Sequence, residues 1–381
     1  MLALRGKMGG DVVMTSRGGS VELKNADNGN NFTESTVRTS WLEPCGDLGS
    51  DLELVESHIR DVICSGDRLM SEVSGYLFEA GGKRLRPALV LLAARLGGGG
   101  APLPISMASA IEVLHTATLL HDDVVDEAAT RRHRPSANAR WGNAIAILAG
   151  GYLLSRAMQV FASAGDAVNH LVCDTIEKIW RGQSQETQNA HNLDLDEGTY
   201  FEIIERKTAA LYELSCRVGS LMAGLPDQQV EALASYGRDL GVAFQLIDDV
   251  LDVVSDEETL GKSPAADMRG GIYTLPVIHT LGQGDPDASR LRVVLAQRDP
   301  PEEELEEALD LLRHNRSIPY TVGAAVSILH RAQGRVECLP DSDAKKALRR
   351  LAQYVLVRPD VAQAVSQYGQ VVWSERDDYC V

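Results

Sequence analysis

Two acidic segments with the same spacing, DDVVD at 122–126 and DDVLD at 248–252, carry the residues best suited to chemistry in this chain. Both follow apolar stretches, although carboxylates repel one another and are costly to bury. A divalent metal ion is the simplest compensation, and oxygen ligands without nitrogen or sulfur favour magnesium. The expected metal ligands are Asp122, Asp123, Asp126, Asp248, Asp249 and Asp252.

The spacing gathers the carboxylates of each segment together if the segment is helical. Asp122 and Asp126 are then one turn apart, with Asp123 beside them. Residues 248–252 repeat this arrangement. One such segment alone is also typical of a solvated acidic helix end. Two of them in apolar surroundings favour a site where several magnesium ions bind one diphosphate.

Basic residues occur where a diphosphate would need them. In GGKRLRP at 81–87, Lys83 and Arg86 lie at a glycine-led helix start, with Pro87 early in the helix. Arg131 and Arg132 follow the first acidic segment, and arginine suits bidentate contacts with phosphate. Either group alone could be a solvated basic turn.

Three further residues gain interest from the carboxylates near them. Lys207 lies in an otherwise apolar and aromatic stretch, where a snorkelling lysine is the ordinary alternative. Lys262 follows the second acidic segment and could be an ordinary loop lysine. His115 lies two turns before Asp122 on roughly the same helix face, and could equally be a satisfied core histidine.

Helices must position these residues. From Leu52 onward apolar residues recur at three- and four-residue spacing, and alternating β-branched runs are scarce. The expected helices are 107–128, 142–164, 168–190, 197–223, 227–253, 272–282, 302–315, 321–337 and 343–356, separated by glycine- and proline-containing breaks. The prediction is an all-α fold, a helical bundle around a deep central cavity, where metal sites are often built.

The domain organisation follows from length and composition. The chain has 381 residues, 44% hydrophobic and 24% charged, which is ample for a large core. Length alone suggests about two or three domains. Because both acidic segments should face one cavity, residues 51–381 are predicted to form a single helical domain. Residues 1–50 hold eight glycines and a polar run at 25–31, and are predicted to be a flexible tail.

Several classes of function are disfavoured. The net charge of −17 argues against nucleic acid as a partner. The six cysteines form no CxxC pair, so neither a zinc site nor a disulfide framework is expected, and a cytoplasmic location fits. No run of 18 apolar residues or signal peptide is evident, so no transmembrane segment is predicted. Membrane contact would be peripheral, for release of a lipid product.

In their order along the chain, the motifs resemble the trans-type polyprenyl (isoprenyl) diphosphate synthases of the medium- and long-chain type. The resemblance covers about 81–276 and rests on GGKRLRP, HTATLLHDDVVDEAATRR, ERKTAAL, GVAFQLIDDVLDVV, TLGK and TLP. It implies the isoprenoid synthase fold, a homodimer, and a magnesium-dependent prenyltransferase that adds isopentenyl diphosphate to an allylic diphosphate.

The resemblance also implies a role for each motif residue. The six aspartates would bind about three magnesium ions and the allylic diphosphate. The residues implied to be catalytic are Asp122, Asp123, Asp126, Lys207, Asp248 and Asp249. Those implied to grip the allylic diphosphate are Arg131, Lys207 and Lys262, with Thr208 and Gln245 lining the reacting prenyl end. Those implied to hold isopentenyl diphosphate are Lys83, Arg86, His115 and Arg132. Fixed cations and metal would stabilise the charge that develops on the leaving diphosphate.

Product length is expected to depend on the fifth residue before the first acidic segment, as the resemblance implies. Here it is Ala117, with Leu114 about one turn deeper, and neither is a bulky aromatic. An open tunnel predicts a product of about C30–C50. Alternatively, other helices supply the floor, with Met158, Phe161 and Trp180 as candidates.

Three residues depart from the family pattern. His133 replaces the usual glycine after the paired arginines, which would strain the loop if that position needs a positive φ. Gly151 replaces a frequent aspartate. A common lysine is missing near Ile272.

Other activities remain as alternatives. A class I terpene cyclase shares the fold and the first acidic segment, although the second full DDxxD pattern and the basic residues favour elongation. A regulatory subunit of a two-component synthase would typically lack the aspartates. A heteromeric synthase with this chain as its catalytic subunit is the third possibility.

Overall fold

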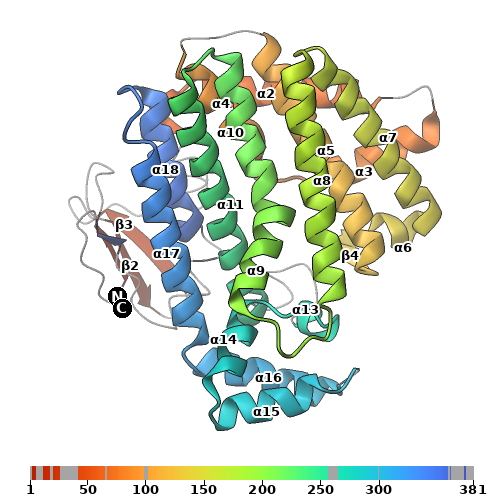
Figure 1. The fold of residues 1–381 in the computed structure, drawn as a ribbon, viewed down its shortest axis with the longest axis vertical. Helices are drawn as coiled ribbons and strands as arrows, with labels where there is room; N and C mark the ends of the chain where they lie inside the picture. Colours follow the sequence, from red (N-terminus) through yellow and green to blue (C-terminus); the bar gives the residue numbers. More distant parts are fainter. Residues whose placement is uncertain are drawn as a thin grey trace.

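The structure is a computed structural model that describes residues 2–5, 12–17, 20–25, 42–64, 67–97, 102–255, 265–298, 300–358, 361 and 373–374. Helices make up nearly all of it, which confirms the all-α prediction (Figure 1). Half of the predicted tail at 1–50 lies outside the described residues, and the prediction that it is flexible stands untested.

The helices follow the order of the chain. Their bounds are α2 Leu48–Ile63, α3 Arg68–Glu79, α4 Leu85–Arg95, α5 Pro102–Val125, α6 Ala137–Trp141, α7 Asn143–Ala162, α8 Asp166–Gln188, α9 Glu197–Ile204, α10 Ala210–Met222 and α11 Asp227–Val254. After the second acidic segment come α13 Ala266–Arg269, α14 Leu275–Gln283, α15 Pro286–Leu295, α16 Glu302–His314, α17 Ser317–Arg335 and α18 Asp343–Val357. Two short helical turns are η1 Glu43–Cys45 and η2 Glu205–Ala209.

Six described helices lie outside the ranges expected from the sequence (α2, α3, α4, α6, α13 and α15), and one expected helix is divided. The helix expected at 197–223 is divided by η2, a π-helical turn between α9 and α10. Helix α15 begins at Pro286, where the sequence pattern predicts a break between two helices. Asp285 caps it by accepting a hydrogen bond of 2.8 Å from the Ala288 N–H, and proline is well placed in a first helical turn.

One continuous core holds the bundle together. Buried apolar side chains form a single cluster that extends from Cys45 to Val361. Helix α10 packs against α4, α5 and α11, so it connects the two helices that carry the acidic segments. Figure 1 shows α14, α15 and α16 together at one end of the bundle.

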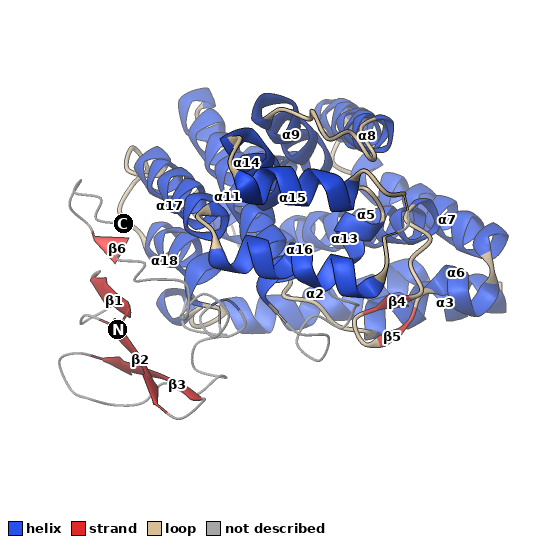
Figure 2. Ribbon diagram, turned by 90° about the horizontal axis from the view of Figure 1, so that it is seen from below, coloured by secondary structure: helices blue, strands red, loops and turns tan. Residues whose placement is uncertain are grey.

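Two small sheets accompany the helices. Strands β1 Leu2–Arg5, β2 Val12–Arg17, β3 Ser20–Asn25 and β6 Trp373–Ser374 form one sheet in the order β3-β2-β1-β6, in which β6 pairs parallel to β1. It lies beside α17 and α18 in both views (Figures 1 and 2). Strands β4 Thr130–Arg131 and β5 Arg134–Pro135 form a hairpin next to the first acidic segment.

Two described helices are long and apolar enough to pass a composition test for membrane spans, α5 and α7. Most of the tested window of α5 is buried inside the bundle, and this helix ends in the first acidic segment. Only a third of the corresponding window of α7 is buried, so α7 presents much apolar surface outward.

Candidate active site

The first acidic segment ends α5 in a turn that groups its carboxylates. Glu127 adopts φ = 49°, the Glu127 N–H donates to the Val124 carbonyl, and the Ala128 N–H donates to the Asp123 carbonyl at 2.9 Å. This is the Schellman pattern of helix ends, built here around a residue other than glycine. Asp122, Asp123 and Asp126 therefore lie in the last turn, where the helix dipole adds further negative charge.

The hairpin β4–β5 then turns the chain back onto this helix end. Arg132 and His133 lie at its tip with φ of 52° and 61°, the signs that a type I′ turn requires at both central positions. Strain was expected at His133 if this position needs a positive φ, and the φ of 61° meets that condition. The turn directs the Arg131 Nε to donate to Asp123, whose side chain is fully buried. Arg131 is thus tied to a carboxylate of the first segment.

The second acidic segment lies in the last turns of α11, and a hydrogen-bond chain fixes its central carboxylate. Asp249 accepts from the Tyr200 hydroxyl and, at 2.8 Å, from the Gln245 amide. Thr208 Oγ1 in turn donates to Gln245 Oε1 at 2.9 Å. The resemblance implied that Thr208 and Gln245 line the prenyl end. In the structure they also orient Asp249 through this chain.

Lys207 sits on the π-helical turn η2 and lies near the first acidic segment. Its ammonium group pairs with Glu186 of α8, and the nearby Asp122 and Asp126 carboxylates contribute to raising the pKa of Lys207. Close packing makes this contact possible, because a Cβ on Gly182 would lie 2.7 Å from the Lys207 backbone nitrogen. π-helical turns occur frequently at functional sites.

Burial destabilises the charged forms of these acids. It raises the pKa of Asp122 to about 6, an effect that Lys207 opposes and Asp126 reinforces. It raises the pKa of Asp249 to about 7, against the lowering effect of the hydrogen bonds from Tyr200 and Gln245. Glu186 also has a raised pKa, chiefly through burial, and both Asp126 and Asp267 add to the increase. Glu186 therefore lies near Asp122 and Asp126 of the first segment and near Tyr200, the hydrogen-bond donor to Asp249 of the second.

A basic group lies at the start of α4, against α5. Arg86 Nη1 lies 3.1 Å from His115 Nε2, and its guanidinium stacks 4.3 Å from the centroid of the Tyr212 ring. Burial and the neighbouring arginines hold the pKa of His115 well below its usual value, so its neutral ring accepts this hydrogen bond. Arg132 is near enough to this group to add to that lowering.

Lys83 and Arg84 have different partners although they are adjacent. Arg84 Nη1 pairs with Glu112 at 2.7 Å and its Nε with Glu56 at 2.5 Å, so it holds α2, α4 and α5 together. Lys83 is exposed, and its ammonium lies 5.6 Å from the centroid of the Phe244 ring. Arg84 is therefore structural, whereas Lys83 is exposed at the surface beside Phe244.

Sequence reasoning missed Arg358, Tyr200 and Glu186. Arg358 follows α18, is fully buried, and donates from Nη2 to Asp248 Oδ1 at 2.9 Å. Its guanidinium also lies 4.7 Å from the Phe244 ring centroid, so Phe244 contacts both this cation and Lys83. No sequence motif marks Arg358, because its partner is 110 residues earlier in the chain. An acidic residue within the apolar face of α8 was the available signal for Glu186.

The remaining predicted residues have mixed outcomes. Lys262 lies outside the described residues. Gly151 is helical, and a Cβ added to it would meet nothing within 4 Å, so an aspartate would fit there as well. Ile272 donates its backbone N–H to the Asp267 carbonyl at 2.8 Å.

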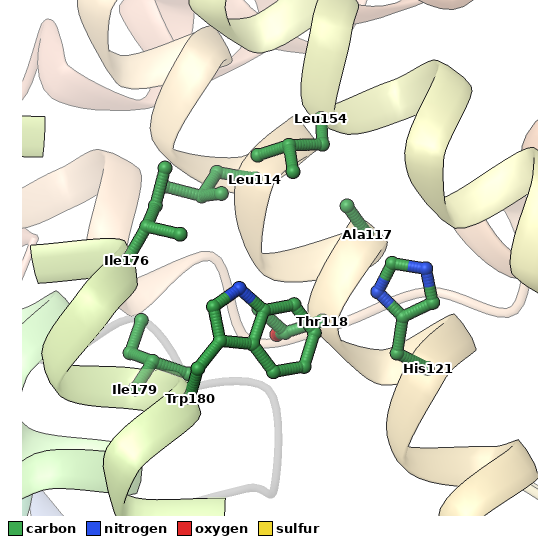
Figure 3. A pocket seen from close by; sticks show the side chains of 8 residues that line it. All are labelled: Leu114, Ala117, Thr118, His121, Leu154, Ile176, Ile179 and Trp180. Atoms are coloured by element: carbon green, nitrogen blue, oxygen red, sulfur yellow. The ribbon is translucent and has the colours of Figure 1, made fainter. Parts of the chain in front are cut away.

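The residues that determine chain length in the prediction line one small cavity. Leu114 and Ala117 of α5 share it with Trp180 of α8 (Figure 3). Met158 instead lines an outer groove, and Phe161 is fully buried without lining either space.

The carboxylates fit magnesium in type and environment. Asp123 Oδ2 is buried without a hydrogen-bond partner in the described part of the chain. Within that part, no three His, Cys, Asp or Glu side chains form a preassembled metal cluster. Magnesium typically keeps several waters and binds through one or two carboxylates together with substrate phosphates. The two acidic segments suit that mode of binding, in which a diphosphate completes the site.

Comparison with known proteins identifies the same family as the sequence motifs. A family profile described as polyprenyl synthetase matches residues 67–312. The chain is 37% identical to nonaprenyl diphosphate synthase of Mycobacterium tuberculosis over 308 residues, covering 80% of this chain and 90% of that one. It is also 37% identical to the short chain isoprenyl diphosphate synthase of Methanothermobacter thermautotrophicus over 313 residues, covering 80% and 96%.

A solved structure shares the whole fold. Polyprenyl synthase of Caulobacter crescentus, complexed with calcium and isoprenyl diphosphate, aligns with a TM-score of 0.78 at 31% identity, covering 87% of this chain and 98% of that one. The fold and the site thus define a helical prenyltransferase. The chain belongs to the polyprenyl synthetase family, whose members depend on magnesium and elongate an allylic diphosphate with isopentenyl diphosphate.

Proposed function

We propose that this protein elongates an allylic diphosphate with successive isopentenyl diphosphate units to an all-trans polyprenyl diphosphate of about C30–C50, with about three magnesium ions per site. The observation that supports it most is the pair of carboxylate groups at the ends of α5 and α11. Glu186, the partner of Lys207, lies near Asp122 and Asp126 and also near Tyr200, which donates to Asp249. We further propose a cytoplasmic location.

The proposed site separates the two diphosphates. Lys207 and Arg131 lie beside the first acidic segment and would bind the allylic diphosphate, with Lys262 added from the segment after α11. Lys83, Arg86 and Arg132 lie on the α4 side and would bind isopentenyl diphosphate, with His115 orienting Arg86. Magnesium, when bound, would supply the positive charge that neutralises the departing diphosphate.

The protein residues would do three things in the reaction. Fixed cations would hold each diphosphate, so the reacting carbons meet in a defined orientation. The apolar walls below the acidic segments would exclude water from the allylic cation. The proton released after carbon–carbon bond formation would pass to the released diphosphate.

We also propose that the enzyme is a homodimer that associates through α7. Ile147 and Leu148 of this helix are 49% and 60% exposed, which is unusual for adjacent large apolar side chains. Sedimentation analysis should show a dimer, and Leu148→Glu should produce monomers. A monomeric wild-type protein would contradict this part of the proposal.

The experiment that tests the function is a product assay. Purified protein is incubated with radiolabelled isopentenyl diphosphate, farnesyl diphosphate and magnesium, and the dephosphorylated products are sized by chromatography. A series ending at a long polyprenol is expected. A cyclic hydrocarbon formed from farnesyl diphosphate alone would indicate a terpene cyclase instead. No product of either kind would contradict a self-sufficient enzyme and indicate a second subunit.

The same assay tests the metal site. Asp122→Ala should lower turnover by about 10²-fold or more, because the carboxylate lies where the leaving group must be neutralised. The melting temperature of this variant should be no lower than that of the wild type. Asp174→Ala, which removes an exposed acid from α8, is the matched control and should keep full turnover.

A further inference from the structure

The space beneath the first acidic segment is almost closed. One face of α5 leads from Asp122 through Thr118 to Leu114 at four-residue intervals. Below Asp122 this face lines an apolar cavity of only about 10 Å³, close to the minimum for one water molecule. A growing prenyl chain that follows this face therefore meets a barrier at the level of Ala117, although alanine itself leaves the way open.

The barrier comes from α8. Trp180 extends its indole toward α5 and faces the cavity together with Ile176 and Ile179 (Figure 3). The indole packs against the His121 ring, with the ring centroids 5.3 Å apart and the planes inclined by 48°. Trp180 is the largest side chain that lines this cavity.

His121 is itself held in place by α7. Its Nε2 lies 3.3 Å from the Ile147 carbonyl oxygen. A Cβ on Gly150 would come within 2.5 Å of the same nitrogen, so the ring fits only because residue 150 is glycine. Trp180 is therefore packed on one side against a side chain with little freedom to move away.

The other side of Trp180 opens to a larger space. A groove of about 550 Å³ that is open to the surface runs between α7 and α8. Its apolar wall is formed by Leu154, Met158, Ile176 and Trp180, and its rim also includes Cys173, Glu177, Arg181 and Ser184. Leu154, Ile176 and Trp180 line both this groove and the inner cavity. The indole thus separates a nearly closed cavity from a larger groove that is open to the surface.

We propose that Trp180 limits the length of the product. The growing chain passes Ala117, reaches the indole, and continues only if the indole yields into the groove, which then receives the apolar tail. This proposal rests on the proposed elongation activity and assigns its length control to α8. Each methylene that the groove shields from water adds favourable apolar burial, so removing the indole favours longer chains.

The experiment compares product lengths of four proteins in the assay with farnesyl diphosphate, isopentenyl diphosphate and magnesium. Trp180→Ala should shift the main product by at least one five-carbon unit toward longer chains, and Trp180→Phe should give a smaller shift. Val293→Ala removes an exposed apolar side chain of α15 that lines neither space, so it should leave the main product unchanged. If Trp180→Ala does not fold, the smaller shift of Trp180→Phe decides the question.

A double variant tests the order of the two barriers. Ala117→Phe alone should shorten the product, since the ring would fill the cavity before the chain reaches α8. Adding Trp180→Ala to Ala117→Phe should not restore length. Elongation by the wild type with an unchanged product in both Trp180 variants would overturn the inference while leaving the proposed function intact. Absence of elongation in the wild type would instead overturn the proposed function.

Discussion

At the scale of single residues, the two acidic segments share a pattern but not an environment. Asp123 is buried against Arg131, whereas Asp249 is held by the neutral donors Tyr200 and Gln245. Asp248 is 41% exposed in its side chain and pairs with Arg358. Carboxylates with identical sequence spacing therefore differ in their hydrogen-bond partners and in their exposure. Such differences suit a site that must bind several cations and one diphosphate.

Tyr200 is predicted to support metal binding without touching substrate. Tyr200→Phe removes one of the two hydrogen bonds that orient Asp249 and should weaken the apparent magnesium affinity by about 10–100-fold. The dependence of turnover on magnesium concentration measures this effect. Tyr152→Phe, on the outer surface of α7, is the control. An unchanged magnesium dependence in Tyr200→Phe would show that Gln245 alone positions the carboxylate.

The raised pKa of Asp249 predicts a pH dependence of stability in metal-free protein. The pKa is about 7 in the folded state, against 3.8 ordinarily. Below pH 4 the Asp249 carboxyl is protonated in both the folded and the unfolded state. Its ionisation therefore does not change the free energy of unfolding in this range. Between pH 4 and 7 only the unfolded state releases the proton readily, so the free energy of unfolding should fall as pH rises and then level off.

This fall is measured by urea unfolding across pH 4–8 in the presence of a chelator. The contribution of Asp249 is the part of the slope that is lost in Asp249→Asn, of the order of 1–4 kcal/mol in total. Equal slopes in the wild type and in Asp249→Asn would mean that the folded carboxyl ionises normally.

At the scale of elements, the π-helical turn η2 determines where Lys207 points. The turn lies against α8 at Gly182, where backbone and side-chain atoms of Arg206 and Lys207 leave no room for a Cβ. A regular helix through 205–209 would rotate the side chains that follow relative to those before. Lys207 pairs with Glu186 because the turn and the glycine act together.

Gly182→Ala should therefore reduce both stability and activity. Forcing a Cβ to 2.7 Å from the Lys207 nitrogen should cost about 1–3 kcal/mol in the free energy of unfolding and move the ammonium away from Glu186. Gly151→Ala is the matched control, since it adds the same methyl to a helix with nothing within 4 Å. The control should be neutral or slightly stabilising, by about 0.5–1 kcal/mol. Denaturation and turnover of the two proteins are compared, and similar behaviour would refute the packing argument.

At the scale of the whole molecule, the end of α18 returns to the site. Arg358 is buried between Phe244 and Asp248, so the last described helix stabilises the second acidic segment from outside the matched family region 67–312. The exposed apolar face of α7 is the surface proposed above for association of two copies. The site thus depends on helices from both halves of the sequence.

Arg358→Ala should lower the free energy of unfolding by about 1–3 kcal/mol, because Asp248 loses a charged hydrogen bond and Phe244 loses its stacking partner. Turnover should fall as well, since Asp248 is no longer held. Arg349→Ala on α18 is the control: its side chain is 43% exposed and lies 3.5 Å from Glu337, so the change should stay within about 0.5 kcal/mol. Chemical denaturation and the product assay measure both effects. Full activity in Arg358→Ala would confine that arginine to a structural role.

The sequence by itself determined the helical class, most helix positions and the acidic and basic motifs, because these depend on periodicity and on residues a few positions apart. The bounds of α16 and α18 agree with the expected 302–315 and 343–356 to within one residue. The family also followed from motifs in order, as the comparisons confirm.

Only the tertiary structure decided which side chains meet across helices. Trp180 and His121 lie 59 positions apart, and Arg358 and Asp248 lie 110 apart, so no local pattern links them. The open tunnel inferred from Ala117 considered one helix, whereas the wall opposite is supplied by α8. Local spacing specifies which residues share a face of a helix. Tertiary packing determines which side chains contact that face, because side chains from distant segments compete for the same volume.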